Sequence, residues 1–131
     1  MENFSLLITT KSAPLRRVVD GALFCKIKEA VLGKKYELSV VFVGEAKIRK
    51  LNKEYRGKDY VTDILSFPVS ETSGEIFICE KKSNQKSKLY NRDPKNFIYF
   101  LFIHGLVHLK GFDHGDIMEA EEQKFRKKFG I

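Results

Sequence analysis

Three histidines in one short segment are the residues of this sequence that could do chemistry together. They are the only histidines among 131 residues. If the segment is helical, His104 and His108 share one face with Cβ atoms about 5–6 Å apart, so both imidazoles can reach one ion. Gly111 allows the helix to end and the chain to turn, which brings His114 round as a third ligand. The spacing predicts one metal ion per chain, with zinc the expected metal and a fourth position open.

The same ligand spacing occurs in the metzincin metalloproteases, whose motif is His-Glu-x-x-His-x-x-Gly-x-x-His. Gly105 stands here where the proteases carry the glutamate that acts as general base. Peptide hydrolysis by that mechanism is therefore disfavoured, and no other general base can be named from the sequence. Asp113 could orient one of the histidines or simply stabilise a turn, and both interpretations stay open.

Hydrophobic patterning predicts the elements that position these histidines. Asp93-Pro94 is a typical helix start, and the apolar run from Phe97 to Leu109 predicts a buried helix, since a membrane span needs about 20 residues. Strands are expected over 4–10, 37–43, 62–67 and 74–79, the last two as a hairpin, and further helices over 14–31, 45–56 and 116–129. The order β-α-β-α-β-β-α-α predicts one α+β domain over residues 1–131, a small mixed sheet packed with surrounding helices.

Composition predicts an ordered and basic protein. The chain is 43% hydrophobic and 31% charged, which argues against disorder. The net charge of +7 is compatible with a polyanionic partner such as RNA, and equally with none. Cys25 and Cys79 lie in apolar surroundings and suit reduced core thiols. The N-terminal segment lacks the pattern of a signal peptide, so we expect a cytoplasmic protein with no membrane association.

Basic residues outside the histidine segment are ambiguous on their own. Segment 80–92 contains several lysines, and a solvated loop or frayed helix is favoured over an RNA-contacting arm. Arg56 could bind phosphate through its fork of donors, but a surface arginine stabilised at a helix C-terminus is the simpler interpretation. On the last predicted helix, Glu122 and Arg126 are spaced as an ion pair, which explains both as structural residues.

Two blocks of the sequence resemble one known family, the bacterial YbeY-type rRNA maturation factors, which are metal-dependent endoribonucleases. The segment HGLVHLKGFDH at 104–114 is similar to the family signature, with Phe112 where tyrosine is common. LNKEYRGKD at 51–59 and TDILSFP at 62–68 are similar to a second conserved block. The order and spacing of the two blocks also fit.

The resemblance implies a mixed sheet with helices, zinc held by the three histidines, and action on single-stranded RNA in small-subunit (16S) rRNA processing. It also implies that Arg56 lines the same cleft and contributes to catalysis. Glu75 stands where the family usually has aspartate, while Asp63 and Ser66 could be cleft residues or polar positions on a strand. The alternative function is an RNA-binding ribosome-assembly factor with a mainly structural zinc; a hydrolase of another substrate, such as a peptide, is disfavoured by Gly105.

Overall fold

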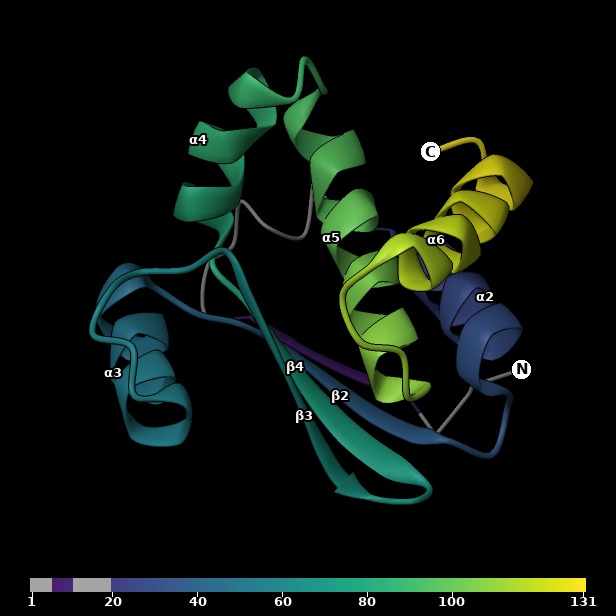
Figure 1. The fold of residues 1–131 in the computed structure, drawn as a ribbon, viewed down its shortest axis with the longest axis horizontal. Coiled ribbons are helices and arrows are strands. Elements are labelled where there is room, and N and C mark those ends of the chain that lie inside the picture. Colours follow the sequence, from purple (N-terminus) through teal and green to yellow (C-terminus); the bar gives the residue numbers. More distant parts are fainter. Residues whose placement is uncertain (1–5, 11–19) are drawn as a thin grey trace.

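The computed structural model describes residues 6–10 and 20–131, in which strands and helices alternate up to β3 and a β3–β4 hairpin is followed by three helices (Figure 1). The strands are β1 (Leu6–Thr10), β2 (Glu37–Phe42), β3 (Ile64–Ser70) and β4 (Ser73–Ile78). The helices are α2 (Gly21–Leu32), α3 (Glu45–Arg56), α4 (Glu80–Leu89), α5 (Pro94–Leu109) and α6 (Asp116–Phe129).

The four strands form one mixed sheet in the order β1-β2-β4-β3. β1, β2 and β4 run parallel, whereas β3 returns antiparallel to β4 as the other half of a hairpin. β3 is therefore an edge strand of the described sheet. One of its sides pairs with β4, and its other side can be approached by residues from outside the sheet.

Helices cover both faces of the sheet because successive side chains of a strand point to opposite faces. Ile76 and Ile78 of β4 belong to the larger core, which they share with α2, α5 and α6. Phe77, between them, packs instead with Leu51 of α3 in a smaller core. Figure 1 shows α5 and α6 on one side of the strands and α3 on the other. Helix α5 is apolar on all sides because it is buried within the larger core.

The predicted α+β domain with a small mixed sheet and a β3–β4 hairpin is confirmed, and the order of elements holds with one addition. Segment 80–92, expected to be a solvated loop or frayed helix, contains the helix α4. Ser83 and Ser87 are buried on that helix, and their small side chains let it pack against α5 without large apolar residues. Residues 4–5 and 14–19, expected in the first strand and first helix, lie outside the described residues.

The two cysteines differ in their burial. Cys79 is buried as predicted, Cys25 is only half-buried, and the two do not form a disulfide. Burial raises the pKa of the Cys79 thiol. None of the helices in residues 20–131 is both long enough and apolar enough to cross a membrane.

Candidate metal-dependent active site

Helix α5 carries two of the three histidines, and its local sequence determines where it begins and ends. The Asp93 carboxylate accepts hydrogen bonds from two backbone N–H groups of the first turn, where Pro94 also lies. The helix ends at Leu109. Gly111 then has a φ of +110°, which residues with side chains rarely adopt. The chain can therefore reverse there and carry residues 112–114 back beside the last turns of α5.

This reversal brings His114 to His104 and His108, as the spacing predicts. The ring centroids lie 4.8 Å apart for His104 and His108, 5.3 Å for His104 and His114, and 4.5 Å for His108 and His114. One possible ligand nitrogen from each ring lies within 4.8 Å of the other two. His104 and His108 are partly buried and His114 is exposed, so the cluster opens to solvent on one side.

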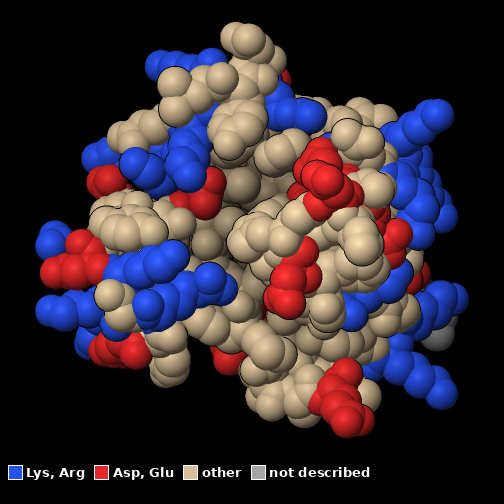
Figure 2. Space-filling view, viewed as in Figure 1, with Lys and Arg blue, Asp and Glu red and all other residues tan. Residues whose placement is uncertain are grey.

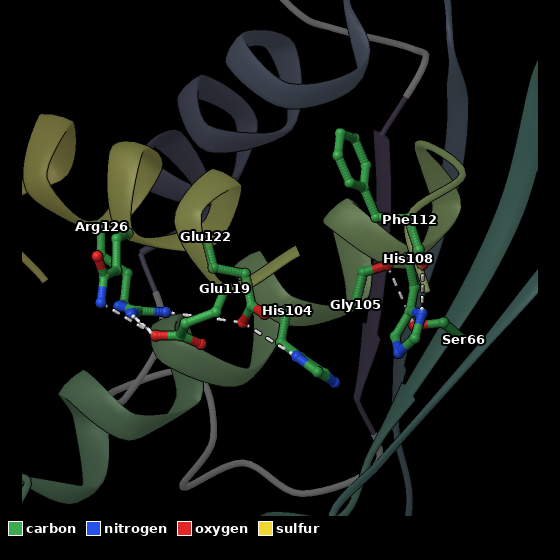
Figure 3. Close-up of polar contacts among 9 residues, drawn as sticks. Ser66, His104, Gly105, His108, Phe112, Glu119, Glu122 and Arg126 are labelled. Atoms are coloured by element: carbon green, nitrogen blue, oxygen red, sulfur yellow. Dashed lines mark hydrogen bonds and ion pairs between the residues drawn. The ribbon is translucent and has the colours of Figure 1, made fainter. Parts of the chain in front are cut away.

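Hydrogen bonds hold two of these imidazoles by their Nδ1 atoms (Figure 3). His104 Nδ1 lies 3.0 Å from Oε1 of Glu122, and His108 Nδ1 lies 3.0 Å from the backbone oxygen of Phe112. A carboxylate and a carbonyl only accept hydrogen bonds, so these contacts favour the tautomer that carries its proton on Nδ1. The Nε2 lone pair of each ring is then available to a metal ion, an arrangement common among histidine ligands.

Glu122 was missed as a site residue, because its helical pairing with Arg126 gave it a structural explanation. That ion pair exists at 3.6 Å, yet the same Oε1 atom also accepts from His104. Glu122 is only 4% exposed, and Arg126 also donates to Glu119 at 2.7 Å. The sequence did carry a signal, since Glu122 is a carboxylate on the same face of α6 as Met118, which the core buries.

Burial lowers the pKa of His108, and repulsion from the other two histidines lowers it further. The charge of Arg56 contributes in the same direction. His108 therefore stays neutral to a lower pH than an exposed histidine does. A neutral imidazole is the form that binds metals, so the environment favours ligation. The three residues fit a transition-metal ion, because imidazole nitrogens suit such metals better than hard cations.

Gly105 is buried where α5 crosses β3, and the packing explains why no larger residue stands there. A Cβ atom at this position would lie 2.7 Å from Oγ of Ser66, and 3.0 Å and 3.1 Å from side-chain atoms of Ile64 and Ile76. The side chain of a glutamate at position 105 would begin in the same filled space. Packing therefore excludes the glutamate that serves as general base in the metzincin proteases. Asp113 is exposed, and neither His104 nor His108 receives its Nδ1 contact from it.

Arg56 is the last residue of α3 and lies at the edge strand. Gly57 ends the helix in a left-handed conformation with φ of +67°. The guanidinium Nη2 donates to the backbone oxygen of Ser66 at 3.4 Å, and its carbon lies 5.9 Å from the centre of the Phe67 ring. Ser66 Oγ in turn donates to the backbone oxygen of Gly105 at 3.3 Å. Ser66 therefore links the end of α3 to the histidine helix.

Asp63 lies beside a cavity of about 370 Å³ whose walls include His104 and His114. Its carboxylate is mostly buried and pairs with Nζ of Lys86 at 3.2 Å. Glu119 and Glu122 also line this cavity. Figure 2 shows the face hollowed at its centre, with acidic side chains around the hollow. Asp63 is thus a cavity residue, which the sequence left undecided.

The remaining polar residues noted in the sequence lie away from the histidines. Lys81 on α4 pairs with Glu45 at 3.0 Å, so part of the positive charge of segment 80–92 is neutralised within the protein. Glu75 lies on β4 and lines a recess beside α3. It is not part of the three-histidine cluster.

Fold and site together define a class of protein: a small α+β domain whose buried helix and following turn present three histidines at an opening to solvent. A family model described as Endoribonuclease YbeY matches residues 3–130. The chain belongs to this family.

Similar proteins support the assignment. A protein from Finegoldia magna named endoribonuclease YbeY is 43% identical over 108 residues, which cover 73% of this chain and 71% of that relative. A protein of the same name from Thermodesulfovibrio yellowstonii is 42% identical over 97 residues, covering 69% of this chain and 60% of the relative. The solution structure of a Thermotoga maritima protein has the same fold, with a TM-score of 0.66 and 24% identity, and covers 95% of this chain and 88% of that one.

Proposed function

We propose that this chain is a zinc-dependent endoribonuclease that cleaves single-stranded RNA. One zinc ion is held by His104, His108 and His114, and Arg56 binds the phosphate at which cleavage occurs. The observation that carries the proposal is the convergence of the three histidines, whose possible ligand atoms lie within 4.8 Å of one another. Family membership supplies the substrate class, since the relatives are named endoribonucleases.

Zinc is favoured by the number and type of ligands. Three neutral imidazoles are a common zinc ligand set and leave a fourth position for water or substrate. Nitrogen atoms in a tetrahedral zinc site lie about 3.4 Å apart when the bonds are roughly 2.0–2.1 Å. The histidines need only small side-chain rotations to reach that spacing. His114 has the greatest freedom to rotate, because it is exposed.

The roles of the protein groups follow from their positions. The bound metal supplies Lewis-acid polarisation of a phosphoryl oxygen and lowers the pKa of water. Glu122 and the Phe112 carbonyl hold His104 and His108 in the tautomer that can ligate. Arg56 presents a fork of N–H donors to a phosphate and stabilises the charge that develops on it during attack.

The proposed substrate is single-stranded rRNA of the small ribosomal subunit, and the proposed compartment is the cytoplasm. The sequence carries a net charge of +7, which favours association with RNA phosphates. The buried Cys79 suits a reduced core thiol, as expected in a reducing compartment.

A mainly structural zinc in an RNA-binding assembly factor agrees less well with the geometry. Structural zinc sites are usually closed by four protein ligands. Among residues 6–10 and 20–131, the cluster contains three histidines and no fourth ligand. The larger core also packs α2, α5 and α6 onto the sheet without using these histidines. The site is therefore not needed to complete the fold.

The deciding experiment is single-turnover cleavage of a labelled single-stranded RNA by purified protein carrying no histidine tag. The protein is compared with and without added zinc, and beside a His108→Ala variant. We expect cleavage that requires metal and is abolished in the variant. RNA binding without metal-dependent cleavage by the unaltered protein would instead support the assembly factor.

A further inference from the structure

An exposed aromatic patch lies on the α3 side of the sheet, away from the histidine cavity. Tyr55 is 66% exposed, and its ring centroid lies 5.2 Å from that of Phe67. Phe67 in turn lies 6.0 Å from Phe77. The three rings border a recess of about 420 Å³. Leu51 and Pro68 also line it, and Glu75 is the one charged residue in its wall, so the recess is mainly apolar. A large exposed aromatic at the mouth of an apolar recess is a typical binding feature.

The helix that carries Tyr55 is rich in cations. Residues 45–59, which are α3 and the turn after it, contain six lysines and arginines but three carboxylates. Arg56 lies over Phe67, within the range of a cation–π contact. One of the carboxylates, Asp59, is already paired with Arg49 at 2.8 Å. The face thus offers positive charge beside the exposed ring of Tyr55 and the partly buried ring of Phe67.

The charged residues that line the histidine cavity, in contrast, are mostly acidic. Three carboxylates, those of Asp63, Glu119 and Glu122, line the histidine cavity, against a single lysine, Lys86, which pairs with Asp63. Glu119 and Glu122 also contact Arg126, which is itself mostly buried. Carboxylates repel RNA phosphates. A strand whose phosphate lies at Arg56 is therefore directed toward α3 and away from α4 and α6.

We propose that Tyr55 and Phe67 form a stacking subsite for an unpaired RNA base, next to the phosphate bound by Arg56. The inference rests on the proposed function and adds the path of the substrate. Proteins that bind single strands combine a cationic groove for the backbone with aromatic rings for the bases. Bases of a duplex are paired and stacked, so the subsite selects single-stranded RNA.

The test measures the affinity of a fluorescent single-stranded RNA oligonucleotide by anisotropy, with chelator present so that no cleavage occurs. Tyr55→Ala is expected to weaken binding by roughly 5- to 100-fold, the effect of losing one base–aromatic stack. Tyr55→Phe retains the ring and is expected to bind as the unaltered protein does. The control is Leu89→Ala, because Leu89 is 79% exposed but ends α4. It is expected to leave the affinity unchanged.

Two further measurements separate stacking from charge and from loss of structure. Tyr55→Ala removes no charge, so the slope of log affinity against log salt stays the same, whereas Lys47→Ala, which removes an exposed cation of α3, is expected to reduce it by up to about one. An oligonucleotide that lacks the stacked base is expected to bind Tyr55→Ala and unaltered protein equally. Equal affinity of Tyr55→Ala and unaltered protein for the intact RNA, or equal losses for Tyr55→Ala and Leu89→Ala, would overturn the subsite. A protein that binds RNA through Tyr55 but never cleaves it would overturn the nuclease proposal alone.

Discussion

The two sides of the edge strand β3 are built in different ways. On the α5 side, His104 and His108 stand on a buried helix, and the Nδ1 atom of each ring makes a 3.0 Å hydrogen bond. On the α3 side, Arg56 is exposed at a helix end, with one 3.4 Å hydrogen bond and one ring contact. The first side is held in place before any ligand binds. The second side can adjust to a substrate.

This difference matches what each side has to do in the proposed reaction. Ligands of a metal ion must converge on one point, so their orientation has to be fixed by neighbouring groups. A phosphate on a flexible strand arrives in varied positions, and a long exposed guanidinium can follow it. Ser66 joins the two sides, because its backbone oxygen accepts from Arg56 and its hydroxyl donates to Gly105.

The largest expected effect comes from removing one of the three metal ligands on the α5 side. His114→Ala is expected to weaken zinc binding by more than the roughly 10- to 100-fold seen when only a residue behind a ligand is changed. The helical signal should persist, because the core does not depend on His114. Elemental analysis and circular dichroism on the same sample provide the measurement. Asp113→Asn, in the same exposed turn, is the control and should retain metal; loss of helix together with metal would show a structural site.

The sequence predicted the α5 side better than the α3 side, because the three histidines lie close together along the chain. Two histidines four apart on a helix and a third after a glycine lie within eleven residues, so helix geometry alone brings them together. Contacts between distant segments could not be derived in this way. Glu122 reaches His104 across 18 positions, and Ser66 reaches Gly105 across 39. Both depend on how α6 and β3 pack against α5.

Local sequence patterns also determined which helices could be predicted. Periodicity predicted α3 and α6, the unbroken apolar run predicted α5, and the glycine and proline signals placed their ends well. Helix α4 was missed because its buried positions are Ser83 and Ser87, which give no hydrophobic pattern. The proposed role of Arg56 rests on the family resemblance, since a lone arginine at a helix end has no distinctive spacing.

Arg56 gives the next largest effect and tests the adaptable side. Arg56→Ala is expected to reduce the single-turnover cleavage rate by about 100-fold or more, with a much smaller loss of RNA affinity, because the charge it stabilises develops during attack. Arg56→Lys should recover only part of the rate, since a point charge cannot reproduce the bidentate fork. Lys58→Ala, two positions away and also exposed, is the control, and it should lose some RNA affinity but keep the single-turnover rate at saturating RNA. Equal losses of rate and affinity in Arg56→Ala would contradict the assignment.

Glu122 tests whether the fixed side needs its buried carboxylate. Glu122→Gln keeps the shape but removes the charge, and its amide can present a donor to His104 and so favour the wrong tautomer. We expect zinc affinity to fall by about 10- to 100-fold, measured by competition with a chelating dye. Glu121→Gln is the matched control, because that neighbouring carboxylate pairs with Lys110 and Lys124 instead. Unchanged zinc affinity in Glu122→Gln would show that its contact with His104 is only structural.

Gly105 tests how closely the two sides are packed. Gly105→Ala should lower the free energy of unfolding by about 1 kcal/mol, the middle of a net range of about 0–2 kcal/mol, because overpacking costs roughly 1–3 kcal/mol and the gain in helix propensity offsets about 1 kcal/mol. Urea denaturation measures the change. Gly21→Ala is the control, since a Cβ there meets nothing within 4 Å. If Gly105→Ala were as stable as the unaltered protein, Ser66 and α5 would be less tightly coupled than the contacts indicate.

The smallest expected effect concerns the lysines of α4, and it asks whether attraction of RNA belongs to the α3 side alone. Lys81 pairs with Glu45 and Lys86 with Asp63, so each already has a carboxylate partner within the protein. An RNA phosphate would have to compete with that partner. Replacing both by alanine is therefore expected to change RNA affinity less than replacing Lys47 and Lys58, the exposed cations of the α3 side, at every salt concentration. Anisotropy titrations of the two double variants at several salt concentrations make the comparison. If the slope of log affinity against log salt falls more in the α4 variant than in the α3 variant, RNA binds beside the carboxylate-lined cavity. The assignment of RNA attraction to the α3 side of β3 would then be wrong.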